Sequence, residues 1–192
     1  MGWKEPGPRP PERFSERTWL RRDICDRRPY PFGDKTIDFV LCVQTLEDVR
    51  DPVWVCSEIN RIAKAGYIEV PSRLEEQSWG VEGPFVGRRH HHWLINVRES
   101  EIEFVFKPHD IHSSPGRYFP AGFFESLNHE ERVERLWWKG TFSYRERVFS
   151  EADDWGVDYP SELVSRELAV RKLRVRPRVR MQRLLTRLLR RP

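Results

Sequence analysis

The chain has 192 residues, of which 38% are hydrophobic and 33% charged, and its eight Trp and eleven Phe supply bulky core material. This composition excludes a fully disordered protein and fits one ordinary domain with polar ends. Residues 166–192 hold eleven Lys or Arg against Glu167 alone, a charge of +10, so residues 1–165 carry −6 within the total of +4. The net positive charge of the chain therefore comes from its C-terminal tail, and we do not expect the rest of the protein to bind nucleic acid.

We identify no targeting signal in the sequence. No stretch approaches the roughly 20 apolar residues that a membrane span needs, and the first residues lack the apolar segment of a signal peptide. The three cysteines have no CxxC spacing, which favours reduced, structural thiols. We therefore expect a cytoplasmic protein, peripheral to a membrane at most.

The first elements in chain order lead up to a strand, helix, strand unit. Residues 1–18 are a flexible leader, because four prolines among charges favour extended backbone. Residues 19–24 predict a brief strand. Residues 37–43 form an apolar run without alternation, which predicts a parallel strand covered on both faces.

A helix follows this strand. Asp51 as N-cap and Pro52 in the first turn are typical of a helix start, and apolar residues recur at helical spacing up to Ala63. Residues 67–70 then predict a second buried strand, joined by a right-handed crossover. The fold class that this indicates is α/β, with a partial Rossmann-like sheet and flanking helices.

The second half of the chain is less regular. Residues 93–97 and 102–106 predict an antiparallel hairpin, residues 119–127 and 130–138 short helices, and residues 141–148 an edge strand. We expect residues 19–150 to form the α/β domain and residues 151–192 to be a linker and helical tail. From Pro177 the apolar residues follow one helix face and the arginines the other, which predicts a basic amphipathic C-terminal helix.

Several stretches of the first half resemble one family in order and spacing. They are Asp-Ile-Cys-Asp at 23–26, Pro-Phe-Gly-Asp-Lys-Thr-Ile-Asp-Phe-Val at 31–40, Leu-Glu-Asp-Val-Arg-Asp-Pro at 46–52 and Ala-Lys-Ala-Gly-Tyr-Ile-Glu at 63–69. Together they resemble the middle of a class I S-adenosylmethionine-dependent methyltransferase, over about residues 19–73. The resemblance implies a Rossmann-like fold, S-adenosylmethionine as cofactor and methyl transfer to a small-molecule or lipid-linked acceptor.

The resemblance also implies positions for the cofactor. Asp23 stands where the family accepts a hydrogen bond from the adenine amino group, and the backbone amide of Ile24 stands beside the ring. Asp38 matches the aspartate that begins the fourth strand of the family. Val43 and Gln44 fall at the carboxyl end of that strand, where open α/β sheets place their ligands. The substrate-binding positions would be Thr45, beside the methyl-transfer site, and His92, on a loop over the substrate.

The sequence also departs from the family. The glycine-rich loop that holds the methionine part of the cofactor belongs before Asp23, and Gly2 and Gly7 are the only glycines there. Asp48 replaces the histidine of Leu-Glu-His, and Ala65 the proline of Lys-Pro-Gly. These departures predict an incomplete domain of doubtful activity by itself, with an unpaired apolar edge on the strand at residues 37–43. The catalytic residues stay unassigned.

Other interpretations of the same residues remain open. Asp23 is equally compatible with a turn cap, and Asp38 and Asp48 with local structural roles. His90, His91 and His92 invite a metal site completed by His109 or His112, but we interpret them as solvent-facing loop residues and predict no metal. The tail at residues 177–192 suggests an alternative function, a non-catalytic module that contacts an anionic membrane, a partner protein or nucleic acid, and its leucines could also pack on the body.

Overall fold

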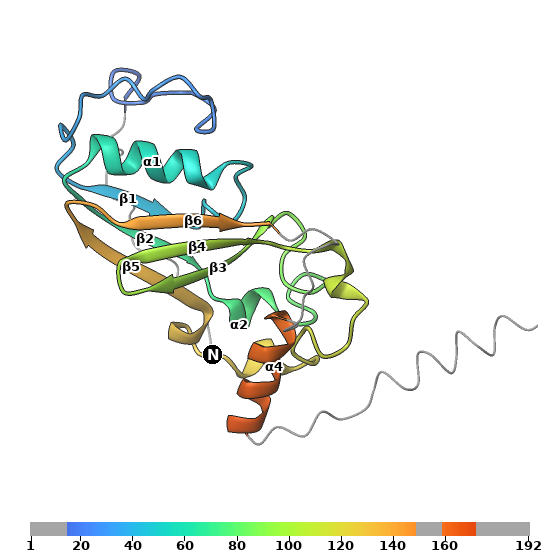
Figure 1. Ribbon diagram of the computed structural model, residues 1–192. Helices are drawn as coiled ribbons and strands as arrows, with labels where there is room; N and C mark the ends of the chain where they lie inside the picture. Colours follow the sequence, from blue (N-terminus) through green and yellow to red (C-terminus); the bar gives the residue numbers. More distant parts are fainter. Residues whose placement is uncertain (1–14, 149–158, 172–192) are drawn as a thin grey trace, which may run out of the picture.

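The computed structural model describes residues 15–148 and 159–171, and Figure 1 shows two small sheets with a helix lying along one side. The first sheet has the strand order β1-β2-β5 and the second the order β3-β4-β6. The strands are β1 (Val40–Val43), β2 (Ala65–Pro71), β3 (Trp93–Arg98), β4 (Glu101–Phe106), β5 (Val133–Lys139) and β6 (Ser143–Arg147). The helices are α1 (Pro52–Ile62), α2 (Arg73–Glu76), α3 (Phe123–Ser126) and α4 (Tyr159–Val170), with 3-10 turns η1 (His109–His112) and η2 (Glu130–Arg132).

The predicted strand, helix, strand unit is present. β1 runs parallel to β2, with Val40 opposite Gly66 and Val43 opposite Glu69. The carboxylate of Asp51 accepts a hydrogen bond from the backbone N–H of Trp54 at 3.0 Å, which confirms Asp51 as the N-cap of α1. β1 is shorter than predicted, because Ile37 contributes only an isolated bridge to Ala63.

One hydrophobic core joins α1 to both sheets. Alternate residues of β1, β2 and β5 face inward, and so do alternate residues of β3 and β4. The buried members of this core include Cys42, Val55, Cys56, Ile59, Ile62, Ile68, Trp93, Ile95, Ile102, Phe104, Leu136 and Trp138. The core therefore fixes the carboxyl end of β1 against both α1 and the second sheet.

The other face of the first sheet is exposed. Leu41 is 71% exposed and Trp137 is 70% exposed, although both carry large apolar side chains. The prediction that both faces of the first strand are covered was therefore wrong, because the burial of β1 alternates along the strand. β1 is also the edge strand of its sheet among the described residues, as the sequence led us to expect.

Other predictions divide between confirmed and wrong. The hairpin is present as β3 and β4, β6 is an edge strand, and α4 lies within the range predicted as linker and helical tail. Residues 19–24 contain no strand, and the helix predicted at 119–127 is reduced to the four residues of α3. The helix predicted at 130–138 was wrong, since most of it is β5, which pairs antiparallel with β2 along seven residues.

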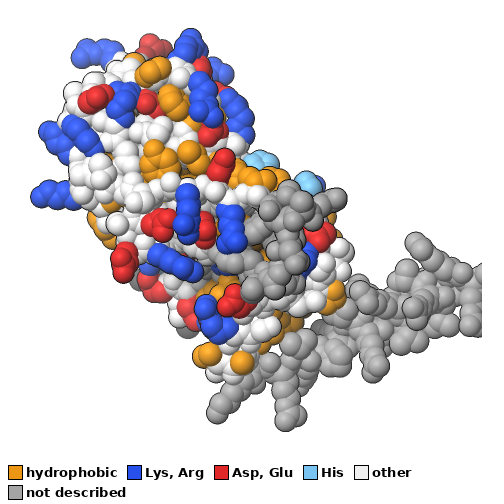
Figure 2. All heavy atoms as spheres, in the orientation of Figure 1, with side chains coloured by type: hydrophobic (Ala, Val, Ile, Leu, Met, Phe, Trp, Pro, Cys, Tyr) orange, Lys and Arg blue, Asp and Glu red, His pale blue; other side chains and the backbone are white. Residues whose placement is uncertain are grey.

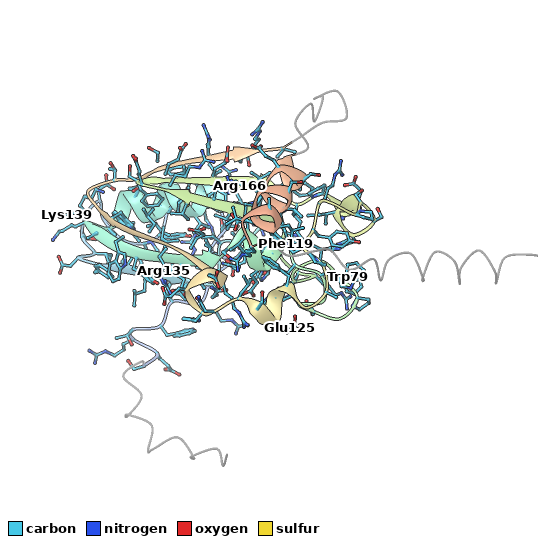
Figure 3. All side chains as sticks on the ribbon, turned by 90° about the horizontal axis from the view of Figure 1, so that it is seen from below. Trp79, Phe119, Glu125, Arg135, Lys139 and Arg166 are labelled. Atoms are coloured by element: carbon cyan, nitrogen blue, oxygen red, sulfur yellow. The ribbon has the colours of Figure 1, made fainter. Side chains whose placement is uncertain are left out.

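A separate cluster holds α4 to the rest of the molecule. Val164 of α4 packs with Phe119, Phe123 and Leu127, and Figure 3 shows Phe119 beneath the helix that carries Arg166. Among the described residues no helix has both the length and the apolar character needed to cross a membrane. The basic amphipathic helix predicted after Pro177 lies outside the described residues. On the face drawn in Figure 2, basic and acidic side chains are interspersed.

Candidate functional site

The turn after β1 is the centre of the candidate site. Gln44 adopts a left-handed backbone with φ of 48°, and its N–H donates to the carbonyl of Glu69 at 2.9 Å. The hydroxyl of Thr45 donates to the carbonyl of Val43 at 2.9 Å, and the N–H of Asp48 donates to the carbonyl of Thr45 at 3.2 Å. A residue other than glycine rarely adopts a left-handed backbone, and such residues are often found at functional sites. The turn leaves the side chains of Val43 and Gln44 exposed at the carboxyl edge of the sheet.

Asp23 and Ile24 are held beside the start of α1. One carboxylate oxygen of Asp23 accepts from the N–H of Cys25 at 2.8 Å, and the other pairs with Arg50 at 2.8 Å. The backbone bond from Cys25 and the bond from Arg50 lower the pKa of Asp23, which is therefore ionised at neutral pH. The carbonyl of Ile24 accepts from the hydroxyl of Tyr30 at 2.8 Å, which fixes the loop. Arg50 lies in the segment that follows Gln44 and Thr45, so its ion pair connects Asp23 to this segment.

Asp38 lies apart from this group. It precedes the amino end of β1, its side chain is 89% exposed, and it pairs with Lys64 at 2.7 Å. A four-residue strand spans about 13 Å, so Asp38 and Gln44 lie at opposite ends of it. The structure therefore places Val43, Gln44 and Thr45 at the carboxyl end of β1, Asp23 beside Arg50 in the segment that leads to α1, and Asp38 at the amino end of β1.

A cavity of about 450 Å³ adjoins Asp23. It is lined by Cys25, Arg27, Arg50, Asp51, Val53 and Glu146. Arg27 lies over the ring of Trp54 at 5.6 Å, so a cation and an aromatic face both border this region. A second cavity of about 320 Å³ lies elsewhere, between α2, β3 and α4, and does not include any of the predicted site residues.

Two histidines meet the same turn from the loop before β3. Nε2 of His90 and Nε2 of His91 each lie 3.7 Å from one carboxylate oxygen of Asp48. The buried Nδ1 of His91 lies 2.7 Å from the carboxylate of Glu76, whose other oxygen accepts from Lys107 at 3.1 Å. Burial opposes ionisation of Glu76, but the bond with His91 and the charge of Lys107 outweigh it and hold its pKa below the usual range. His92 has an exposed side chain, and its N–H donates to the carbonyl of Glu47 at 2.8 Å.

Glu47 lies in the same region and is 1% exposed. Burial raises the pKa of this carboxyl to about 7, and the charge of His91 acts in the opposite direction. Among the described residues its Oε2 has no hydrogen-bond partner. Buried polar atoms are nearly always paired, so this unpaired carboxylate oxygen is an uncommon feature of the region.

Sequence reasoning missed the group around His91. It considered His90 and His92 on one strand face, with His109 or His112, whereas the structure brings together His90, His91 and Asp48. The one available signal was that Asp48 stands where the family has a histidine. Nothing in the sequence joins Glu76 or Lys107 to that position, because they lie on different elements.

Comparison with known proteins gives one family match. Residues 9–68 match the family described as "Methyltransferase domain", and this range contains Asp23, β1, α1 and the first residues of β2. Comparisons with curated proteins and with solved structures give no match. The matched range ends within β2, so it includes β1, which pairs parallel with β2, and the helix between them. Over residues 9–68 the chain is therefore similar to the methyltransferase-domain family.

Proposed function

We propose that the chain binds S-adenosylmethionine at the carboxyl edge of β1 and takes part in methyl transfer to a small-molecule or lipid-linked acceptor. The observation that supports this proposal is the turn after β1, which begins with a left-handed Gln44 and continues to Arg50, the residue that pairs with Asp23. In this arrangement Asp23 and Ile24 would hold the adenine, and Val43 and Gln44 would border the sulfonium.

For methyl transfer, the main task of the protein is to position the methyl donor and the acceptor. The methyl carbon leaves the sulfonium sulfur, which becomes a neutral thioether, and bonds to a nucleophilic atom of the acceptor, which gives up a proton. Much of the rate gain in such a displacement comes from holding nucleophile and methyl group in line. Thr45 and His92 flank the turn and are the residues proposed to contact the acceptor. The sites at Asp23 and at Gln44 provide two separate anchors for the donor.

Isothermal titration of the full chain with S-adenosylmethionine tests the proposal. We expect saturable binding, and Asp23→Ala should weaken it about tenfold or more, because a hydrogen bond to a charged group contributes about 1.5–3 kcal/mol. Asp34→Ala is the matched control, since Asp34 is also exposed and paired with an arginine, Arg61, at 2.9 Å.

Two outcomes of this titration would contradict the proposal. No heat of binding at millimolar S-adenosylmethionine, or equal weakening by the Asp23 and Asp34 substitutions, would overturn the proposed cofactor site. Transfer of an isotope-labelled methyl group to candidate acceptors, followed by mass spectrometry, then tests catalysis separately from binding.

A further inference from the structure

We propose that Asp48, His90 and His91 form a binding site for a divalent transition-metal ion, of which Zn²⁺ is the best fit. One oxygen of Asp48 and one nitrogen from each imidazole lie within 4.8 Å of one another. In a tetrahedral zinc site with bonds of about 2.0–2.1 Å, two ligand atoms are about 3.4 Å apart. Each histidine nitrogen is 3.7 Å from the Asp48 oxygen, so a small side-chain movement closes the site.

The hydrogen bonds of His91 support this inference. Its Nδ1 lies 2.7 Å from the carboxylate of Glu76, within hydrogen-bond distance. Its Nε2, the other ring nitrogen, lies 3.7 Å from the carboxylate of Asp48. A carboxylate behind a histidine is the arrangement that orients metal-binding imidazoles and raises their basicity.

The groups behind His91 are themselves tightly packed. Glu76 is 1% exposed, and Lys107, which is 7% exposed, binds both Glu76 and the carbonyl of Arg88. Gly87 has a φ of 61°, and a Cβ at this position would lie 2.4 Å from the carbonyl oxygen of Glu76. The loop that carries His90 and His91 is therefore fastened closely to α2 and the end of β4.

Glu47 is an independent observation at the same place. It is adjacent to Asp48 in the chain, it is buried, and its Oε2 lacks a hydrogen-bond partner among the described residues. A cation held by Asp48 and His91 would give this orphaned carboxylate a counter-charge.

The ligand set indicates the kind of ion. Two imidazoles and one carboxylate suit Zn²⁺ and neighbouring first-row ions, whereas Mg²⁺ and Ca²⁺ prefer an all-oxygen environment. Three protein ligands leave coordination positions for water or for a heteroatom of a substrate. Because Asp48 lies four residues after Gln44, such a substrate would be bound close to the carboxyl edge of β1.

The experiment is a Zn²⁺ titration of the untagged full chain in competition with a chromophoric chelator. We expect one equivalent to bind, with His90→Ala and Asp48→Asn each weakening it more than about tenfold, the lower limit for losing a supporting residue. His90 and Asp48 have exposed side chains, so both variants should fold, which circular dichroism checks. His92→Ala is the matched control, because His92 is an exposed histidine in the same loop but lies outside the cluster.

A second variant tests the role of Glu76 as a positioning residue. Glu76→Gln keeps the size of the side chain but removes the carboxylate, and it should weaken Zn²⁺ binding about 10–100-fold. Replacing Zn²⁺ by Co²⁺ gives a visible spectrum whose intensity reports coordination, and His90→Ala should change it while His92→Ala should not.

Three results would overturn the proposal. They are no binding of Zn²⁺ at micromolar concentration, unchanged affinity in both His90→Ala and Asp48→Asn, or equal losses in His90→Ala and His92→Ala. The last result would mean that the exposed histidines bind the ion without Asp48 and His91.

Discussion

Glu58 is a buried carboxylate that connects α1 to the loop leading away from Asp23. It accepts from the N–H of Tyr30 and pairs with Arg61 at 2.7 Å, while its side chain is 4% exposed. Arg61 also donates to the carbonyls of Tyr30 and Phe32. Two charged residues of α1, Glu58 and Arg61, therefore fix the loop that follows Asp23 and Ile24.

This arrangement predicts a pH dependence of stability. The bond with Arg61 lowers the pKa of Glu58 despite its burial, so the folded protein binds this proton less readily than the unfolded chain. The stabilisation is complete above the unfolded pKa of about 4.3 and is lost as the pH falls through the folded value. Glu58→Gln should reduce the free energy of unfolding by about 1–3 kcal/mol at pH 7. Urea denaturation from pH 7 to pH 3 should show this difference shrinking below about pH 4.

Glu125→Gln is the control for this measurement, because Glu125 is an exposed glutamate on α3. It should leave the unfolding midpoint unchanged at each pH. A difference between wild type and Glu58→Gln that stays constant down to pH 3 would contradict the assigned role of Glu58.

At the scale of elements, the two faces of the first sheet differ sharply. Leu41 and Leu136 are in the same sheet, but Leu41 is 71% exposed and Leu136 is 2% exposed. Truncating an exposed leucine removes little buried area, whereas truncating a buried one leaves a cavity.

The matched substitutions Leu41→Ala and Leu136→Ala test this difference. Leu41→Ala should change the free energy of unfolding by at most about 0.5 kcal/mol, and Leu136→Ala should lower it by about 2–5 kcal/mol. Thermal or urea denaturation measures both. A loss above about 2 kcal/mol for Leu41→Ala would show that its face is covered in solution.

Local sequence patterns predicted the elements whose formation depends on interactions between neighbouring residues. Asp51 and Pro52 predicted the start of α1, and the apolar runs predicted β1, β2 and the β3–β4 hairpin. β5 was mistaken for a helix because Val133, Leu136 and Trp137 are spaced by three and four residues, as on a helix face. Its true character depends on pairing with β2, more than 60 residues earlier, and on Trp138 rather than Trp137 facing the core.

The same reasoning separates the two parts of the candidate site. Asp23, Gln44 and Thr45 were predicted from the order of the motifs, and the structure places Gln44 and Thr45 in the turn directly after β1. Asp48 and His91 are 43 positions apart, and contacts between distant segments, such as the bond from the backbone N–H of His92 to the carbonyl of Glu47, bring them together. No periodicity encodes such a contact, so the histidine cluster became visible only in the fold.

At the scale of the whole molecule, the described residues contain more than one core. The main core contains side chains from α1 and from both sheets, so these elements stabilise one another. A separate cluster of Phe119, Phe123, Leu127 and Val164 holds α4, with added contacts from an ion pair between Arg171 and Glu131. Regions with a small core of their own open more readily than the rest of a protein.

Hydrogen–deuterium exchange should therefore show α4 opening independently of β2. Val164 is 2% exposed, and Val164→Ala removes apolar area worth about 1–2 kcal/mol, so it should speed exchange in α4 about tenfold. Exchange in β2 should stay unchanged, because Ile68 and Val70 belong to the main core. Ser165→Ala, a neighbouring exposed position, is the control and should affect neither element. Equal acceleration in α4 and β2 would instead make the two cores one cooperative unit, and Val164 would then stabilise the carboxyl edge of β1 as well.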